Sequence, residues 1–300
     1  MTDASIVIAC HTERRWASLL AAIASAHEQS LPSLQVIVAV DNNPSLSRRL
    51  RAEVDMVEVV DHSGIPGASG TRNAGAARAQ SPLLAFLDDD VRAHPDWLAE
   101  LLAPFTDPNV VGTGGRTLPA WQGREPSWFP SEFGWVVGAS YTGLPTSRAP
   151  IRNVWSENMA VRRRVFEAVG GFRPGFGKHG VTSRPEDTDL CLRISAGTPG
   201  ARWFYVPTAV VEHVVPLDRS TLRFFLHRCY AEGAGKLDLS GYHGAEALDA
   251  EREFLRRTVP HGVARHLRDG DGARALTILA GTVAVGLGAL TTLARSRSKR

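Results

Sequence analysis

The chain has little that would mark it as a secreted or disulfide-stabilised protein. Its 300 residues include three cysteines, an odd number that contains no Cys-x-x-Cys pair. We expect Cys10, Cys191 and Cys229 to be buried, reduced thiols, as in a cytoplasmic protein. Asp3 comes early and the first apolar run is short, so the amino-terminal segment is not expected to be a secretory signal.

An excess of charge of one sign is also absent, as are several common enzyme motifs. The 34 Lys and Arg residues nearly balance the 31 Asp and Glu residues, leaving a net charge of +3, which gives no reason to expect a nucleic-acid partner. There is no G-x-G-x-x-G after the first apolar strand, no G-x-x-x-x-G-K-[ST] and no G-x-S-x-G. These absences argue against a dinucleotide dehydrogenase, a P-loop NTPase and an α/β-hydrolase.

Short apolar runs that alternate with helical patterns are present in the first half of the chain. The expected strands are residues 5–10, 34–40, 57–60 and 83–87. Helical spacing of apolar residues follows the first strand, at Trp16, Leu19, Leu20 and Ile23. Nearly continuous apolar strands that alternate with helices predict an α/β fold with a mostly parallel sheet, whose ligand lies beyond the carboxyl ends of the strands.

The pattern is weaker from residue 112 onward. Gly, Pro and Ser crowd residues 112–150, together with Trp121, Trp128 and Trp135. These aromatic residues either lie in loops over a flat or sugar-like substrate or close a second small core. Short strands are expected at 203–206 and 209–211, separated by Pro207, and a basic helical region is expected after residue 216.

Three consecutive aspartates, Asp88, Asp89 and Asp90, follow the apolar strand at residues 83–87. Adjacent carboxylates repel one another unless a cation neutralises them. Such oxygen ligands suit Mg²⁺ or Mn²⁺, which usually also hold the phosphates of a substrate. The run therefore predicts a divalent cation site, and the alternative is a solvated acidic turn that begins the next helix.

A second acidic group and a histidine occur in the other half of the chain. Glu186, Asp187 and Asp189 follow a glycine-rich loop and precede a helical pattern. Acidic residues favour the first turn of a helix, but a carboxylate there could also accept a proton from an attacking hydroxyl. His213 follows a predicted strand and is either a core histidine or, if it meets the carboxylates, a ligand for Mn²⁺ or Mg²⁺.

Two further polar residues lie where an α/β sheet binds its ligand. Asp41 ends the second strand and either accepts hydrogen bonds from a base or ribose or opens a turn with Asn42 and Asn43. Arg72 lies near an expected helix start, and helix N-termini bind anions.

Taken in order, these motifs resemble the family 2 glycosyltransferases of the GT-A fold. The matching segments are SIVIAC at 5–10, VDNN at 40–43, GTRNAG at 70–75, FLDDDV at 86–91, ENMAVRR at 157–163, VGGF at 169–172, PEDTDLCLR at 185–193 and YVPTAVVEH at 205–213. Each segment is short, and the identification depends on all eight occurring in the family's order.

The resemblance implies an inverting transfer of a sugar from a nucleotide-diphosphate sugar to a hydroxyl acceptor, with Mg²⁺ or Mn²⁺ as cofactor. It implies the following donor-site residues: Thr12, Glu13, Asp41, Arg72, Asp88 and Asp89. Asp90 and His213 would ligate the metal together with Asp88. Asp187 would be the general base, and Glu186 would bind the acceptor or support its loop.

The resemblance covers roughly residues 4–215, and together with the composition of the remaining segment it gives an arrangement of the whole chain. We expect a GT-A catalytic domain at 1–216, with a nucleotide-binding half at about 1–115 and an acceptor half at about 116–216. A basic helical extension follows at 217–272, and an apolar, membrane-facing helix with a basic tail follows at 273–300. Two alternatives remain open, a sugar nucleotidyltransferase and a non-catalytic nucleotide-sugar-binding module.

One long uncharged run stands apart near the carboxyl end. Residues 275–294 contain no charged side chain, and Leu, Ile and Val make up eight of these 20 residues. The length is enough to span a bilayer, but basic residues lie on both sides of the run and disfavour a single span. We therefore expect a helix that lies on the inner face of the cell membrane and tethers a cytoplasmic enzyme of cell-envelope glycan or glycolipid synthesis, whose acceptor is a glycan or is linked to a lipid.

Overall fold

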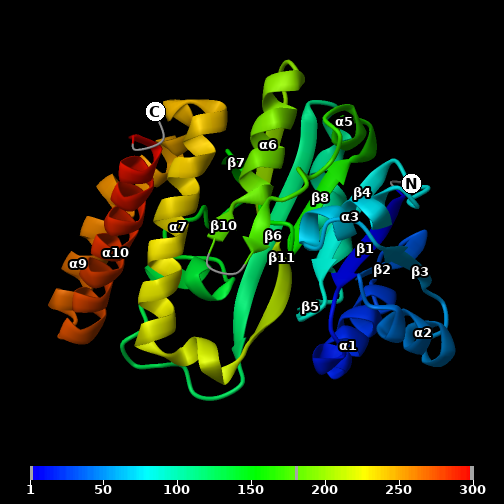
Figure 1. The fold of residues 1–300 in the computed structure, drawn as a ribbon, viewed down its shortest axis with the longest axis horizontal. Helices are drawn as coiled ribbons and strands as arrows, with labels where there is room; N and C mark the ends of the chain where they lie inside the picture. Colours follow the sequence, from blue (N-terminus) through cyan, green and yellow to red (C-terminus); the bar gives the residue numbers. More distant parts are fainter. Residues whose placement is uncertain (1–2, 180–181, 298–300) are drawn as a thin grey trace. The chain divides into compact units, whose positions relative to one another are not determined.

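The computed structural model describes residues 3–179 and 182–297, and Figure 1 shows its helices and strands. The chain divides into two compact units. The first unit comprises Met1–Leu118, Pro145–Gly177 and Glu186–His213, and the second comprises Pro119–Leu144, Lys178–Pro185 and Val214–Arg300. Every site residue predicted from the sequence belongs to the first unit.

The described residues form both helices and strands along the whole chain. The strands are β1 (Ala4–Cys10), β2 (Gln35–Asp41), β3 (Glu58–His62), β4 (Leu83–Asp88), β5 (Val91–Ala93), β6 (Val110–Trp121), β7 (Ala149–Ile151), β8 (Asn158–Arg162), β9 (Gly177–His179), β10 (Thr182–Arg184) and β11 (Arg202–Val215). The α-helices are α1 (Trp16–His27), α2 (Pro44–Glu53), α3 (Ala68–Ala76), α4 (Trp97–Leu102), α5 (Arg163–Ala168), α6 (Glu186–Gly197), α7 (Leu222–His243), α8 (Asp249–Glu253), α9 (Val259–Arg268) and α10 (Gly272–Arg297). A short 3₁₀ helix, η1 (Glu13–Arg15), lies between β1 and α1.

The main sheet has the strand order β3-β2-β1-β4-β8-β6-β11-β5, with β7 paired to β11. The first four strands are parallel, and Ile8 of β1 lies opposite Val38 of β2 and Leu87 of β4. Strand β8 runs antiparallel to both β4 and β6. The α/β class and the parallel arrangement expected for the first half of the chain are confirmed.

Helices cover both faces of this sheet because successive side chains of a strand point to opposite faces. Ile6 and Ile8 pack with residues of α1, α2 and α4 in one apolar cluster. Val7 lies in a second cluster with residues of α3, α5 and α6. Burial on both faces explains why these strands are almost continuously apolar.

Strand β6 is not predicted by the sequence, because its glycines indicate irregular structure. A Cβ on Gly112 would lie 2.1 Å from the ring of Trp203, and one on Gly114 would lie 2.4 Å from Cβ of Val154. Large neighbouring side chains fill the space above this strand, so it needs glycine for packing rather than for a turn.

Strand β11 is also longer than predicted, since it continues through Pro207 rather than breaking there. It pairs with β7 at residues 203–205 and with β5 at residues 211–213. Pro207 lies between these two pairings, and a missing N–H is tolerated at such a position on a sheet edge.

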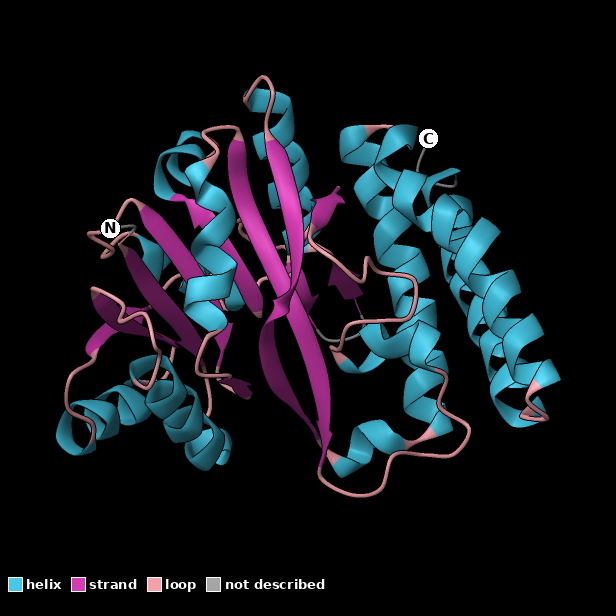
Figure 2. Cartoon of the chain, turned by 180° about the vertical axis from the view of Figure 1, so that it is seen from behind, coloured by secondary structure: helices cyan, strands magenta, loops and turns pink. Residues whose placement is uncertain are grey.

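The second unit has its own core, in which aromatic side chains pack together with residues of α7 and α10. These two long helices lie side by side among the helices drawn in cyan in Figure 2. Trp128 packs edge-on against Phe225 of α7, with ring centroids 5.7 Å apart. Trp121 and Trp135 are partly buried against the same cluster. Of the two interpretations of these tryptophans, the closing of a second small core is therefore the one observed.

Candidate active site

The predicted donor-site residues gather at the carboxyl ends of β1, β2 and β4. Thr12 and Glu13 follow β1, Asp41 ends β2 and Asp88 ends β4. Because β1 pairs in parallel with both neighbours, these ends lie at one edge of the sheet. This is the edge at which open α/β sheets bind ligands.

Arg72 reaches this edge from α3, which packs closely on the sheet. A Cβ on Gly75 would lie only 2.5 Å from Cγ1 of Val7, so a larger residue there would push the helix outward. Asn73 bonds the backbone N–H and C=O of Phe172, at 2.9 Å and 2.7 Å. The Arg72 side chain, 5% exposed, pairs through Nη2 with Oδ1 of Asp88 at 2.5 Å.

The three consecutive aspartates are neutralised in part by two arginines. Nη1 of Arg15 lies 2.8 Å from Oδ1 of Asp89 and 2.8 Å from Oδ2 of Asp90, while Arg72 pairs with Asp88. Burial raises the pKa of Asp89 to about 6, against the opposing effect of the Arg15 charge. The local sequence predicts a metal ion as the neutralising cation and does not indicate Arg15, which comes from a segment 74 residues away.

Asp90 and His213 meet because β5 pairs with β11, which places Val91 opposite His213. Nε2 of His213 lies 3.5 Å from Oδ2 of Asp90, and both side chains are more than nine-tenths buried. Two atoms bound to one ion at about 2.1 Å, the usual Mg²⁺ distance, are about 3 Å apart across a right angle. Nδ1 of His213 has no hydrogen-bond partner among the described residues.

These residues fit a divalent cation that completes its shell with oxygens from a substrate. Among residues 3–179 and 182–297, no three His, Cys, Asp or Glu side chains are grouped so as to hold a metal by themselves. Mg²⁺ commonly uses one or two protein ligands together with phosphates and water. The pairing of Asp90 with His213 corresponds to that kind of partial site.

Asp187 lies in the first turn of α6, directly after Glu186, whose Oε1 lies 3.5 Å from Nη1 of Arg72. Oδ1 of Asp187 is buried and has no hydrogen-bond partner in the described part of the chain. Burial, followed by the neighbouring Glu186, raises the pKa of Asp187 to about 7, although Arg72 and a hydrogen bond from Ser156 lower it. Asp187 is therefore a carboxylate that can take up a proton near neutral pH.

Glu157 is an acidic residue of this region for which the sequence predicts no role. Asn158 of β8 lies opposite Leu87 of β4, so Glu157 comes next to Asp88. Burial raises its pKa well above the usual glutamate value, and the charges of Asp187 and Asp88 raise it further. Nothing in the local sequence indicates this proximity, because it arises from the antiparallel pairing of strands distant in the chain.

Asp189 differs from Asp187 in its surroundings, although both lie in the first turn of α6. Its side chain is fully buried and pairs with Arg193 at 2.7 Å and with Arg173 at 3.2 Å. Arg193 also donates to the carbonyls of Val169 and Gly171. Asp189 therefore fixes the start of α6 on the preceding loop.

The remaining predicted residues have local contacts. Oδ2 of Asp41 accepts from the backbone N–H of Gly67 at 2.8 Å, and Oδ1 accepts from Asn42 at 2.8 Å. Thr12 caps η1 by accepting from the backbone N–H of Arg14, and Glu13 is exposed. Asp41 thus holds the loop before α3 to the end of β2.

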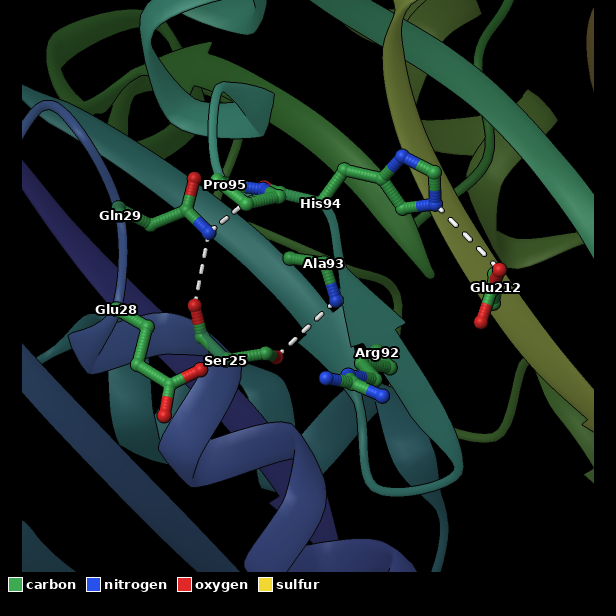
Figure 3. Close-up of a pocket in the computed structure, with 8 residues that line it drawn as sticks. All are labelled: Ser25, Glu28, Gln29, Arg92, Ala93, His94, Pro95 and Glu212. Carbon is green, nitrogen blue, oxygen red and sulfur yellow. Dashed lines mark hydrogen bonds and ion pairs between the residues drawn. The ribbon is translucent and has the colours of Figure 1, made fainter.

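A separate hollow of about 230 Å³ lies beside β5, and Figure 3 shows its side chains. It is lined by Ser25, Glu28, Gln29, Arg92, Ala93, His94, Pro95 and Glu212. Glu212 and His213 are neighbours in a strand, so their side chains point to opposite faces. The hollow contains none of the predicted site residues.

Comparison with known proteins shows the family of this chain. Residues 5–170 match the sequence family described as Glycosyl transferase family 2. The chain is 28% identical over 257 residues to the glucosyl-dolichyl phosphate glucuronosyltransferase of Haloferax volcanii, covering 84% of this chain and 82% of that relative. It is 30% identical over 228 residues to the pre-mycofactocin glycosyltransferase of Mycobacterium tuberculosis, covering 71% of this chain but 44% of that relative.

Solved structures have the same fold. A mannosyltransferase from Pyrobaculum calidifontis, in complex with GDP-Man and Mn²⁺, superposes with a TM-score of 0.60 and 16% identity over 96% of this chain and 86% of its own. GalNAc-T7, with UDP, GalNAc and Mn²⁺, superposes with a TM-score of 0.57 and 16% identity over 85% of this chain and 54% of its own. The family match covers more than half of the chain, and the fold is the expected GT-A fold, so this chain belongs to glycosyl transferase family 2 and is a glycosyltransferase.

Proposed function

We propose that the chain transfers a sugar from a nucleotide-diphosphate sugar to a hydroxyl acceptor, with inversion at the anomeric carbon and with the help of Mg²⁺ or Mn²⁺. The main support is Asp187, whose Oδ1 is buried and unpartnered and whose pKa is raised to about 7. A carboxylate of this kind can remove a proton from a hydroxyl near neutral pH. It lies in the same cluster as Arg72 and Asp88, which come from the donor edge of the sheet.

In this mechanism Asp187 takes the proton of the acceptor hydroxyl as that oxygen forms its bond to the anomeric carbon. The bond from the same carbon to the diphosphate oxygen breaks on the opposite face, which inverts the configuration. Ser156 and Arg72 hold Asp187 in place and limit the rise in its pKa. A divalent cation held by Asp90, His213 and Asp88 would neutralise the charge that develops on the leaving diphosphate.

The donor-binding roles of Thr12, Glu13, Asp41 and Asp89 belong to the same proposal. Asp41 would accept a hydrogen bond from the base, next to the loop that it already holds through Gly67. Glu186 would support the acceptor side, because it is next to Asp187 in the chain and pairs with Arg72.

A screen of nucleotide sugars for thermal stabilisation tests this function and its metal dependence together. One or more donors should raise the melting temperature of the wild-type protein when Mn²⁺ is present, because ligand binding stabilises the folded state. In Asp90→Ala the metal-dependent part of this stabilisation should be lost, with donor affinity in Mn²⁺ falling by about 10–100-fold or more, since even residues that only orient metal ligands contribute that much.

The matched control for this screen is Asp96→Ala, a surface aspartate in the same segment whose carboxylate bonds Ser30. It should keep the wild-type response. If Asp90→Ala keeps an unchanged Mn²⁺ titration, Asp90 is not a metal ligand. If the product has retained anomeric configuration by NMR, the inverting mechanism is wrong.

We also propose a lipid-linked or envelope-glycan acceptor and attachment to the inner face of the membrane through α10. Among the described residues, the helical segment Gly272–Ala294 is long enough and apolar enough to cross a bilayer, and its mean hydropathy is 1.8. Its exposed side chains form one apolar stripe: Leu276, Leu279, Val283, Leu287, Leu290 and Leu293. The name of the Haloferax relative, which includes a dolichyl phosphate, agrees with a lipid-linked acceptor.

The packing of α10 favours a helix on the membrane surface over one that spans it. Gly288 lies against the backbone of Tyr230, and Gly233 of α7 lies against the backbone of Val285. Helix α7 also carries ion-paired Arg228, Glu232 and Lys236. A spanning α10 would bring these charges into the hydrocarbon region or lose its contact with α7, and both are costly.

The double variant Leu279→Glu/Leu290→Glu should therefore lose binding to vesicles that contain anionic phosphatidylglycerol. Both side chains are exposed, so the fold should persist while the apolar stripe acquires two charges. Flotation of the full chain with such vesicles measures the loss. The double variant Leu34→Glu/Met56→Glu, at exposed apolar positions of the first unit, should float like the wild type. Equal flotation of all three proteins would contradict the proposed attachment.

A further inference from the structure

The contacts of Arg15 point to a function beyond ordinary ion pairing. Its Nη1 atom lies 2.8 Å from carboxylate oxygens of both Asp89 and Asp90. The same Oδ2 atom of Asp90 lies 3.5 Å from Nε2 of His213. A single guanidinium therefore approaches the oxygen that we assigned to the divalent cation.

The local backbone gives Arg15 this position without burying it completely. Arg15 ends η1 and precedes α1, and its backbone is not helical, with φ −102° and ψ 19°. Its side chain is 33% exposed, whereas those of Asp89 and Asp90 are 5% and 8% exposed. The guanidinium can therefore withdraw toward solvent, while the two carboxylates remain inside.

The carboxylates of Asp89 and Asp90 require a positively charged partner whether or not a metal is bound. Arg72 pairs with Asp88 and Glu186, so within the described chain its charge is already shared. Without Arg15, the carboxylates of Asp89 and Asp90 would lie side by side in a buried setting, which is costly. Oδ2 of Asp89 is buried and has no hydrogen-bond partner among the described residues, so this group has capacity for a further positive ligand.

We propose that Arg15 is a built-in counter-ion that competes with the divalent cation for Asp90 until the donor binds. In the donor-free protein Arg15 neutralises Asp89 and Asp90, which lowers their affinity for the metal. When the donor arrives, its diphosphate offers oxygen ligands to the metal and a new anionic partner to Arg15. Metal and donor therefore bind together, because each removes an obstacle to the other. This inference rests on the metal site proposed above.

Binding of Mn²⁺ to the nucleotide-free protein, followed by electron paramagnetic resonance, tests the competition directly. Arg15→Gln should bind Mn²⁺ at least about fivefold more tightly than the wild type, since a competing charge about 4 Å away is worth about 1 kcal/mol even in water, which is a factor of about five in affinity. Arg15→Lys, which keeps the charge, should stay close to the wild-type affinity. Arg14→Gln is the matched control, because this neighbouring arginine is exposed and the substitution changes the net charge equally.

A second titration, with UDP or GDP present, measures the coupling. The nucleotide should increase Mn²⁺ affinity more in the wild type than in Arg15→Gln. Equal or weaker Mn²⁺ binding by folded Arg15→Gln, with circular dichroism as the check on folding, overturns the role of Arg15 and leaves the metal site intact. If Asp90→Asn binds Mn²⁺ as the wild type does, or no variant binds it, the metal site fails and the role of Arg15 fails with it.

Discussion

Asp187→Asn is expected to abolish sugar transfer while leaving donor binding nearly intact. Asparagine keeps the shape of the side chain but cannot accept the proton of the acceptor hydroxyl. A general base typically contributes about 10²–10⁴-fold to a rate, and the loss in kcat should be of that order. Calorimetry with Mn²⁺ and the stabilising nucleotide sugar should give a donor affinity close to the wild-type value.

The same variant should be more stable than the wild type at alkaline pH. The folded chain holds a proton on Asp187 up to a pH of about 7, whereas an unfolded aspartate releases it near pH 4. The native state therefore binds the extra proton in this range, and wild-type stability falls as the pH rises through it. Asparagine carries no such charge, so the melting temperature of Asp187→Asn should exceed that of the wild type by more at pH 8 than at pH 5.

Asp189→Asn provides the matched control in the same turn of α6. Asp189 is fully buried and paired with Arg173 and Arg193, so its replacement should lower the melting temperature. A rate loss in Asp189→Asn should disappear when activity is corrected for the folded fraction. If Asp187→Asn instead loses donor binding, Asp187 belongs to the donor site and another group is the base.

Arg72→Gln is expected to cause the largest loss of stability in the first unit. The guanidinium is 5% exposed and is the partner of Asp88 and Glu186, with Asp187 close by. Removing one member of a buried ion pair typically costs about 3–5 kcal/mol, because the remaining charges are left uncompensated. The melting temperature should fall by roughly 2–4 °C for each kcal/mol in a unit of this size.

The loss of stability in Arg72→Gln should also depend on pH, and the substitution should change the pH dependence of catalysis. Arg72 lowers the pKa of Asp187, so without it the native carboxylate holds its proton to a still higher pH. The stability deficit should therefore grow as the pH rises above about 7, and the acidic limb of the kcat/KM profile should move to higher pH. Arg193→Gln, which removes one of the two arginine partners of Asp189 instead, should destabilise the chain without moving this limb. If both variants move it equally, Arg72 acts on Asp187 only through the fold.

Much of the first unit could be predicted from the sequence because its signals are local. The continuous apolar runs of β1, β2 and β4 follow from burial on both faces of a sheet, and the acidic residues follow directly after β4. Strand β6 could not be predicted, since its glycines are required by Trp203 and Val154, which are distant in the chain.

The sequence by itself determined the family, the α/β fold and most of the polar residues at the carboxyl edge of the sheet. It could not show what neutralises these residues, because an aspartate beside an arginine and one beside a metal have the same local pattern. Only the tertiary structure brought Arg15 to Asp89 and Asp90, and Glu157 to the side of Asp88. These contacts depend on strand pairing and on a helix start distant in sequence, and they decide the charge balance of the site.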